Sequence, residues 1–390
     1  MNATTAAIDL AKNVFQVVLV DANYRVLEQH RLTRAQFERF FDNRKVSRIV
    51  MEACGSAHHW ARVFGARGIE VILLPAMYVR AYVRRSKTDA ADALALLEAL
   101  RCADIVAVKV KSVEQQSLQA LHRTRSLWMG TRTSRINALR GFCRELGLHV
   151  PIGARTGLEA MGRAVADEQS PITPLLRPIM LQLLDEIRLL ETRVAQLERQ
   201  LAQLARESHA CKLLMSIPGI GLLTATAILA ATAGSVAHFK SARHFASWFG
   251  LTPKENSSGT MRRMGRISKM GDRYLRMLLT HGARSVLRAA KVAQLKGIEL
   301  IGLRHWALAL QARSNHNKSA CALANKMARI CYAVLRDQTP FGQPAARLAK
   351  KMQRQSFELA YRSTIHYLAL PRDDSTHHGN YGRTTTRRCR

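Results

Sequence analysis

The sequence has no run of about 18 apolar residues, the length that a helix needs to cross a bilayer. Its first residues, MNATTAAIDLAKN, lack the basic, apolar and small-residue segments of a signal peptide. These two absences predict a soluble protein of the cytoplasm that has no membrane partner.

Cysteine is present, but no two cysteines are spaced like a metal or redox motif. The seven cysteines are odd in number, widely scattered and never arranged as CxxC. This pattern indicates neither a disulfide framework nor a zinc site. We therefore expect reduced, buried thiols.

Acidic residues are scarce. The 390 residues include 60 Lys and Arg against 28 Asp and Glu, which leaves a formal net charge of +32. Such a charge disfavours an ordinary enzyme of small metabolites and favours nucleic acid as the partner. Because 47% of the residues are hydrophobic, the chain has enough apolar material for two or three domains, which excludes wholesale disorder.

Residues 1–110 alternate between strand-like and helix-like segments. The pattern predicts strands at residues 6–10, 14–20, 26–32, 47–52 and 71–75, and helices at 35–43, 57–66 and 89–102. Three consecutive strands followed by alternating helices and strands is the order of a ribonuclease H-like α/β fold, a mixed sheet with helices on both faces. The order favours that fold without being unique to it.

Residues 111–208 are predicted to be helical. Ser112 and Gln115 form a capping box before a helix that runs to about Leu146. Apolar residues then recur at alternating spacings of three and four from Met180 through Leu183 to Leu204, as in a heptad seam. The seam predicts a coiled coil within or between chains, and an amphipathic helix packed on its own domain is the alternative. The candidate nucleic-acid contacts up to this point are Lys87, Arg123, Arg132 and Arg135.

Residues 209–340 form a third region, mostly helical, which opens with Ile217-Pro-Gly-Ile-Gly221. Such a turn is typical of a helix-hairpin-helix, where glycines let the backbone approach a phosphate and the next helix offers its amides. Gly219 and Gly221 are therefore candidate nucleic-acid contacts, and a purely structural tight turn is the alternative. Residues 341–390 form a basic extension, and we expect its tail after Pro371 to be disordered until it binds a polyanion.

Four carboxylates are conspicuous in so basic a chain. Asp9 falls in the first strand, Glu52 ends the fourth, and Asp89 and Asp92 open a helix on one face. In the ribonuclease H-like order the first and fourth strands are neighbours and the last helix crosses their ends, which brings the four carboxylates together. Mg²⁺ is the hard dication that neutralises such a cluster and bridges to phosphate. The alternative is that Asp89 caps the helix and Asp92 is a surface charge.

A basic segment after Leu251 surrounds Ser257, Ser258 and Gly259. A serine among cations can attack a phosphodiester, because the positive charges stabilise the transition state. A turn serine without a chemical role is the alternative. The cations that predict a phosphate-binding surface are Lys254, Arg262, Arg263, Arg266, Lys269, Arg273 and Arg276.

Several of these blocks occur in the same order in one known family. The blocks are Asp9 in AIDLAKN, Glu52 in MEACGSAHHWA, KTDAADA, the PGIG turn, and LTPKENSSG followed by GRISKMGDRYLR. On these blocks the chain resembles transposases of the insertion-sequence family 110 (IS110). The resemblance covers nearly the whole chain to about Asp337, and the tail after Pro371 lies outside it.

The resemblance implies an N-terminal RuvC-like domain, a coiled-coil linker and a C-terminal transposase domain with a nucleophilic serine. We transfer that serine to Ser258, with Ser257 as the alternative. The acidic tetrad named DEDD, with its Mg²⁺, is transferred to Asp9, Glu52, Asp89 and Asp92.

The resemblance further implies a function at the bacterial nucleoid. Family members recombine donor and target DNA through a protein–DNA phosphoserine, are guided by a structured bridge RNA, and assemble as homo-oligomers up to tetramers. Two other functions stay open. One is a RuvC-like nuclease that hydrolyses DNA with metal-activated water, and the other is a nucleic-acid-binding protein without activity.

Overall fold

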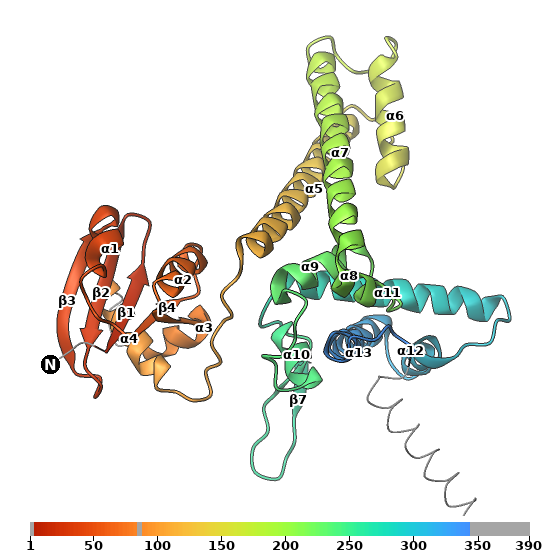
Figure 1. Cartoon of the computed structure of the whole chain (residues 1–390). Coiled ribbons are helices and arrows are strands. Elements are labelled where there is room, and N and C mark those ends of the chain that lie inside the picture. The colour runs from red at the N-terminus through yellow and green to blue at the C-terminus, as the bar shows by residue number, and fades with distance from the viewer. Residues whose placement is uncertain (1–3, 84–87, 344–390) are drawn as a thin grey trace, which may run out of the picture.

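The computed structural model describes residues 4–83 and 88–343. Along the chain, Figure 1 shows an α/β domain, a rod of long helices and a helical domain from which a narrow hairpin extends. An extended segment links the α/β domain to the rod.

A five-stranded mixed sheet forms the centre of the α/β domain. Its strands are β1 (Thr5–Leu10), β2 (Val14–Val20), β3 (Val26–Thr33), β4 (Arg48–Glu52) and β5 (Glu70–Leu74), in the order β3-β2-β1-β4-β5. β2 is antiparallel to both of its neighbours, whereas β1, β4 and β5 run parallel. The predicted mixed sheet is confirmed, as is the pairing of the first and fourth strands. The ribonuclease H-like class itself stays a prediction.

Helices cover both faces of this sheet because its central strands bury side chains on both sides. α1 (Arg34–Phe40) and α2 (Ala57–Ala66) cover one face, where Phe15 stacks on Phe37 beside Trp60. α4 (Asp89–Leu100) covers the other face, where Leu96 packs in one cluster with Val50. Two short helices, α3 (Ala76–Val79) and η1 (Arg80–Tyr82), precede α4.

The rod consists of α5 (Val113–Glu145), α6 (Ala154–Ala166) and α7 (Leu176–Glu207). α5 and α7 lie antiparallel, because Leu118 near the start of α5 packs with Leu201 of α7, whereas Leu139 packs with Met180. The apolar seam of α7 therefore faces α5 of the same chain, and a supercoiled coiled coil stays a prediction. The capping box at Ser112 is confirmed.

Two details of the rod differ from the predictions. Near its ends, α7 buries Leu184 and Ala205 in place of the predicted Leu183 and Leu204, and Leu204 is 40% exposed. Within the region predicted as helical, α6 was not predicted as a separate helix, because glycines inside it lower helix propensity. Its apolar positions nevertheless bury Met161 against the rod.

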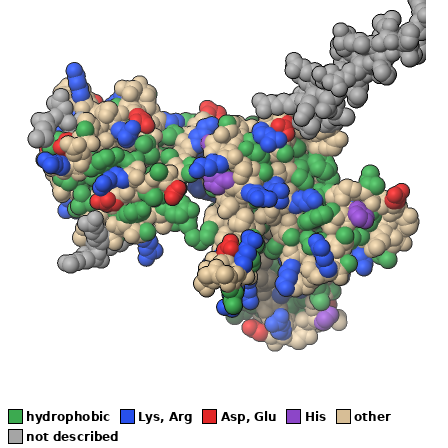
Figure 2. All heavy atoms as spheres, turned by 90° about the horizontal axis from the view of Figure 1, so that it is seen from below, with side chains coloured by type: hydrophobic (Ala, Val, Ile, Leu, Met, Phe, Trp, Pro, Cys, Tyr) green, Lys and Arg blue, Asp and Glu red, His purple; other side chains and the backbone are tan. Residues whose placement is uncertain are grey.

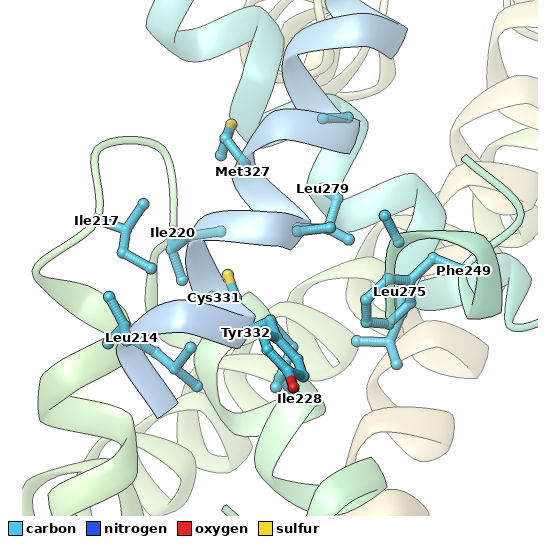
Figure 3. Close-up of a cluster of buried hydrophobic side chains, with 14 of the residues drawn as sticks. Leu214, Ile217, Ile220, Ile228, Phe249, Leu275, Leu279, Met327, Cys331 and Tyr332 are labelled. Carbon is cyan, nitrogen blue, oxygen red and sulfur yellow. The ribbon is translucent and has the colours of Figure 1, made fainter. Parts of the chain in front are cut away.

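The helical domain holds the largest core. Its helices are α8 (His209–Met215), α9 (Leu222–Thr232), α10 (Ala242–Trp248), α11 (Arg273–Leu295), α12 (Gly302–Ala312) and α13 (His316–Asp337), and β6 (Pro253–Glu255) and β7 (Met264–Ile267) form the hairpin. Figure 3 shows that Ile217 and Ile220 of the turn after α8 lie beside Cys331 of α13, within a cluster that also includes Leu279 of α11. The predicted helical character of this region is confirmed.

The six cysteines that the structure describes are free thiols, as predicted. Cys143, Cys211 and Cys331 are buried as predicted, whereas Cys54, Cys102 and Cys321 are only half-buried, and Cys389 lies outside the described residues. No helix within the described ranges combines the length and the apolar character needed to span a bilayer.

Candidate functional site

The carboxyl edge of the sheet carries Asp9 and Glu52 on one face. Ala7 and Val50 are partners in the parallel pairing of β1 with β4, and both are buried in the cluster that α4 covers. Because strand side chains alternate between faces, Asp9 and Glu52, each two residues further on, point to the same side of the sheet. Two carboxylates therefore end neighbouring strands on the α4 side.

The first turn of α4 lies toward this same edge. After the last turn of α4, the Arg101 guanidinium lies 5.6 Å from the ring centre of Tyr24, which follows β2 at the opposite edge of the sheet. A helix of 12 residues is about 18 Å long, so α4 starts near the carboxyl ends of β1 and β4. Its first turn holds Asp89, which is exposed, and Asp92, which is half-buried. The topology thus brings the four predicted carboxylates to one edge.

The described side chains at this edge are not gathered closely around one point. Within the described residues, no three His, Cys, Asp or Glu side chains lie close enough together to hold an ion. The acidic turn also has a structural role, because Thr88 caps α4 by accepting a hydrogen bond from the Ala91 amide at 3.2 Å and acidic side chains suit a helix N-terminus. Carboxylate oxygens fit Mg²⁺ by chemical type. The four carboxylates therefore stay a predicted Mg²⁺ site.

The predicted serines lie in the loop between β6 and β7. Ser258 and Met261 pair as an antiparallel bridge, with backbone hydrogen bonds of 3.2 and 3.1 Å in the two directions. Gly259, directly after Ser258, has a φ of 54°, in the left-handed region that tight hairpin turns require. The glycine beside the serine therefore has a structural cause.

The two serines differ in their hydrogen bonds. The Ser257 hydroxyl donates to Oε1 of Glu255 at 2.8 Å and accepts from the Arg263 amide at 3.1 Å. No hydrogen bond connects the Ser258 side chain with any described residue, and the whole loop is exposed. Ser257 therefore holds the loop together, whereas the Ser258 hydroxyl is open to a ligand.

The predicted cations lie on the hairpin and at the start of α11. Arg262 approaches the Glu255 carboxylate at 3.3 Å, and Arg276 donates to the carbonyl of Phe249 at 2.9 Å. Seen from below in Figure 2, Lys and Arg side chains clearly outnumber Asp and Glu on the visible face of the molecule. The remaining predicted cations are exposed: Lys254, Arg263, Arg266, Lys269 and Arg273.

Two glycines hold the base of the hairpin. Gly250 has a φ of 69° and Gly271 a φ of 100°. A Cβ on Gly250 would lie 2.1 Å from the carbonyl oxygen of Met270, and one on Gly271 would lie 2.0 Å from that of Trp248. The segments before β6 and after β7 thus approach each other so closely that only glycine fits. This close approach fixes the direction in which the hairpin leaves the domain.

Two predicted arginines of the rod are engaged within it. Arg132 donates to Oε1 of Glu191 at 2.8 Å, and Arg135 donates to Oε2 of Glu186 at 2.7 Å, so both connect α5 to α7. Arg123 is exposed instead. It lines a cavity of about 720 Å³ between α5, α9 and α11 together with Arg273, so these two predicted contacts come together. Lys87 lies outside the described residues.

The structure gives Gly219 a packing role, which was the alternative to a phosphate contact. This residue has a φ of 86°, and a Cβ here would lie 2.7 Å from the Gly282 carbonyl oxygen and from side-chain carbons of Val286 and Met327. Close packing on α11 and α13 therefore accounts for the glycine, and its contact with nucleic acid stays a prediction. Gly221, which is exposed before α9, stays a candidate contact.

The junction between the α/β domain and the rod was missed in the sequence. The Lys111 carbonyl accepts from Nη1 of Arg62 at 2.6 Å, and the Lys111 amide donates to Nδ1 of His58 at 3.2 Å. The Lys111 ammonium donates to Gln119 of α5 at 3.1 Å. Burial, followed by the charges of Lys111 and Arg62, lowers the pKa of His58 to about 4, so this ring is neutral and can accept. Because the partners are far apart along the chain, no local motif signals this contact.

A buried histidine connects three helices of the protein. His122 of α5 lies 3.0 Å from the Tyr274 hydroxyl of α11 through Nδ1 and 3.0 Å from Oγ1 of Thr226 of α9 through Nε2. Burial, and then the charge of Arg125, lowers the pKa of His122 to about 4. The ring is therefore a neutral structural link beside the cavity that Arg123 and Arg273 line.

Two transposase family models match separate parts of this chain. A DEDD transposase model of the IS110 type, described as "Transposase", matches residues 6–146, and the model described as "Transposase IS116/IS110/IS902 family" matches residues 211–296. Together the two matches include the carboxyl edge of the sheet and the hairpin.

Individual relatives align over most of the chain. A probable family 20 transposase of Pseudomonas aeruginosa is 40% identical over 340 residues, which are 87% of this chain and 98% of the relative. The transposase for insertion sequence element IS1111A of Coxiella burnetii is 36% identical over 335 residues, 86% and 90% of the two chains. The pilin gene-inverting protein of Moraxella bovis is 25% identical over 363 residues, 87% and 98% of the two chains. On this evidence the chain belongs to the IS116/IS110/IS902 family of insertion-sequence transposases.

Proposed function

We propose that this transposase is a site-specific DNA recombinase that excises and inserts its element through a covalent bond between Ser258 and DNA. The Ser258 hydroxyl oxygen forms an ester with a backbone phosphorus as the bond from that phosphorus to the leaving sugar oxygen breaks. The serine proton is released, and the leaving oxygen takes up a proton. Because the ester conserves the phosphodiester bond energy, a sugar hydroxyl of another strand can displace the serine and be joined.

The observation that carries this proposal is the difference between the two serines. The Ser257 hydroxyl is used twice inside the loop, by Glu255 and by the Arg263 amide. Ser258 lies at the exposed end of the hairpin among cations that can stabilise the negative charge of the transition state. Ser258 is therefore the nucleophile in our proposal, with Ser257 as the residue that shapes its turn.

The acidic edge is the proposed Mg²⁺ site, with Asp9, Glu52, Asp89 and Asp92 as ligands. When bound there, magnesium supplies positive charge to the reacting phosphate oxygens. The protein contributes the spacing of these carboxylates, since β1 and β4 fix two of them and the Thr88 cap fixes the turn that carries the others. RuvC-like ancestry of the domain is part of this proposal.

Joining, and not only cutting, is favoured by one relative. The Moraxella protein is named for inverting a pilin gene, and inversion requires that the cut strands be rejoined. Storage of the bond in a serine ester meets that requirement without an external energy source.

We also propose a guide RNA and a homo-oligomer, as the family resemblance implies. A net charge of +32 supports a protein that binds polyanions such as RNA and DNA. Figure 1 shows the hairpin well separated from the α/β domain within one chain. A site that contains both Ser258 and the carboxylates therefore forms between subunits of a dimer or tetramer in our proposal.

The test is a search for the covalent adduct. Full-length protein is mixed with RNA transcribed from the flanking non-coding region, end-labelled donor and target DNA, and Mg²⁺, and is then run on a denaturing gel. We expect a slow band that protease removes, and we expect Ser258→Ala to lack it. Ser257→Ala is the matched control, which keeps the band at reduced yield because it loses only the loop contacts.

A metal-dependent nuclease is the second candidate, because within one chain the α/β domain with the acidic edge lies apart from the hairpin, whose loop carries Ser258. Cleaved DNA without an adduct, at the same rate in Ser258→Ala, would establish this candidate. An adduct that persists in Ser258→Ala and disappears in Ser257→Ala would transfer the chemical role to Ser257. Binding without cleavage under any Mg²⁺ concentration would indicate a protein that binds nucleic acid without cutting it.

A further inference from the structure

A long groove follows α13 and reaches the hairpin. Its volume is about 1790 Å³. Residues 264–267 of β7 form one wall, α13 forms the opposite wall from Asn315 to Asp337, and Trp306 of α12 and the segment 339–343 complete the lining. The strand that forms this wall continues from the loop of Ser258, so the groove is linked to the proposed nucleophile through β7.

The groove has a strong excess of positive charge. Five of its described lining residues are cations and one, Asp337, is an anion. Asp337 is engaged by the neighbouring Arg336 at 2.8 Å. The Lys326 ammonium lies 4.0 Å from the centre of the Trp306 ring, so a cation–π contact holds this charge in the wall. The other cations are exposed: Arg266, Lys269, Lys318 and Arg329.

The same groove also offers apolar and amide surface. Ile330, Ala333 and Phe341 lie among the cations, as do Asn317 and Asn325. A DNA duplex presents mainly phosphates to a protein surface. Its base faces are stacked inside the duplex, so the apolar side chains of the groove could not contact them. A single strand presents phosphates together with base faces and base edges, which apolar, cationic and amide groups can all contact.

We propose that this groove binds a single-stranded segment of nucleic acid that leads to the phosphate attacked by Ser258. α13 has 22 residues and is therefore about 33 Å long, which accommodates several nucleotides. Because it leads to the attacked phosphate, the segment is DNA that is unpaired at the cleavage site, and an unpaired stretch of guide RNA is an outcome of the test. The inference rests on the proposed function for its partner and for the role of Ser258, whereas binding in the groove does not require cleavage.

The C-terminal extension is the competing occupant, because it continues from the end of the groove at Gln343. Residues 344–390 contain 10 Lys and Arg against 3 Asp and Glu. Like charges repel, so a basic segment fits a basic groove less well than a polyanion does. The extension becomes one of the outcomes of the test.

The test measures binding in the absence of Mg²⁺, so that its failure is separate from failure of the adduct experiment. Full-length protein is titrated into fluorescent DNA and RNA single strands of about 12 nucleotides, and into a duplex of the same length, at several salt concentrations. The double variant Lys318→Ala/Arg329→Ala removes two exposed cations of the groove wall. Its matched control, Arg288→Ala/Lys291→Ala, removes one Arg and one Lys from the exposed side of α11 outside the groove.

We expect the groove variant to bind single strands at least about tenfold more weakly and to lower the log–log salt slope by about 1.4, which is about 0.7 for each lost phosphate contact. The control should keep the slope of the unmodified protein. The stronger of the DNA and RNA arms identifies the source of the segment. Equal slopes for both double variants, or an effect on the duplex alone, would overturn the proposal.

Cys321 provides a second measurement because it lines the groove and is half-buried. Bound single strand should slow its alkylation severalfold, as quantified by mass spectrometry, with Cys102 of the α/β domain as the internal reference. Unchanged Cys321 reactivity at saturating single strand would contradict the proposal. A Cys321 that reacts faster after nucleic acid is added than in the free protein would identify the C-terminal extension as the occupant.

Discussion

Gly219, in the turn before α9, and Gly282, in the middle of α11, touch backbone to backbone. A Cβ on Gly282 would lie 2.1 Å from the carbonyl oxygen of Gly219, and a Cβ on Gly219 would lie 2.7 Å from the carbonyl oxygen of Gly282. Neither neighbour is a flexible side chain that can move aside. The PGIG turn is therefore locked onto the helix that starts directly after the hairpin.

We expect Gly282→Ala to lower the free energy of unfolding by about 2 kcal/mol, because overpacking of a close contact typically costs about 1–3 kcal/mol. Urea unfolding followed by circular dichroism measures the change. Gly162→Ala is the matched control, since it lies in helix α6 with open space around a Cβ. This control should be neutral or more stable by up to about 1 kcal/mol. Equal stability of Gly282→Ala and the unmodified protein would contradict the contact.

Arg132 and Arg123 should respond differently to substitution. Arg132 is 17% exposed and paired with Glu191, so Arg132→Ala should lower stability by about 0.5–1 kcal/mol and leave the salt dependence of DNA binding unchanged. Arg123→Ala should leave stability unchanged and reduce the log–log salt slope by about 0.9. Thermal unfolding and binding titrations measure the two effects. A fall in slope for Arg132→Ala as large as that for Arg123→Ala would show that this ion pair opens to bind nucleic acid.

Acidification should destabilise the protein through His122. Its pKa in the folded chain is about 4, whereas an unfolded histidine has a pKa near 6.5, so the unfolded state takes up the proton first. The stability contributed by neutral His122 is complete above about pH 6.5 and is lost as the pH falls toward 4, by an amount on the order of 3 kcal/mol. His122→Gln should flatten the stability profile in this window. A profile with unchanged slope would place the proton uptake elsewhere, and His58→Gln, with the same shift, is the next variant to measure.

Asp9→Asn should abolish strand cleavage and leave RNA binding nearly intact. The change removes one carboxylate of the proposed metal site and little contact to phosphate. Gel-shift titration and the cleavage assay measure the two properties in the same preparation. Asp42→Asn makes the same change in charge at an exposed ion pair with Arg67 and should cleave normally. Cleavage by Asp9→Asn at the normal rate would remove this residue from the site.

Local patterns predicted the elements that depend on local sequence. Strand alternation located β1 to β5 to within about two residues, and Ser112 with Gln115 located the start of α5. These elements follow from the period of the side chains and from a cap that closes within four residues. The pairing of β1 with β4 followed from the order of the elements.

Contacts between segments that are far apart along the chain could not be predicted from local patterns. The packing of Gly219 on Gly282 could not be predicted because the two residues are far apart along the chain. The ion pair of Arg132 could not be predicted because the sequence does not show that Glu191 lies opposite. The different hydrogen bonds of Ser257 and Ser258 depend on the hairpin of β6 and β7. This hairpin was not predicted, because its residues are mostly polar or charged and lack the apolar alternation of a strand.

The rod of α5 and α7 folds back on itself, so the chain enters and leaves it at the same end. Its length therefore does not enter the separation between the sheet that carries Asp9 and the hairpin that carries Ser258. If one heptad were added to or removed from both α5 and α7 at the far end of the rod, near α6, the length of the rod would change. The geometry at the base of the rod would stay the same. The reach of the rod and the arrangement of the two proposed reactive sites at its base can therefore vary independently of each other.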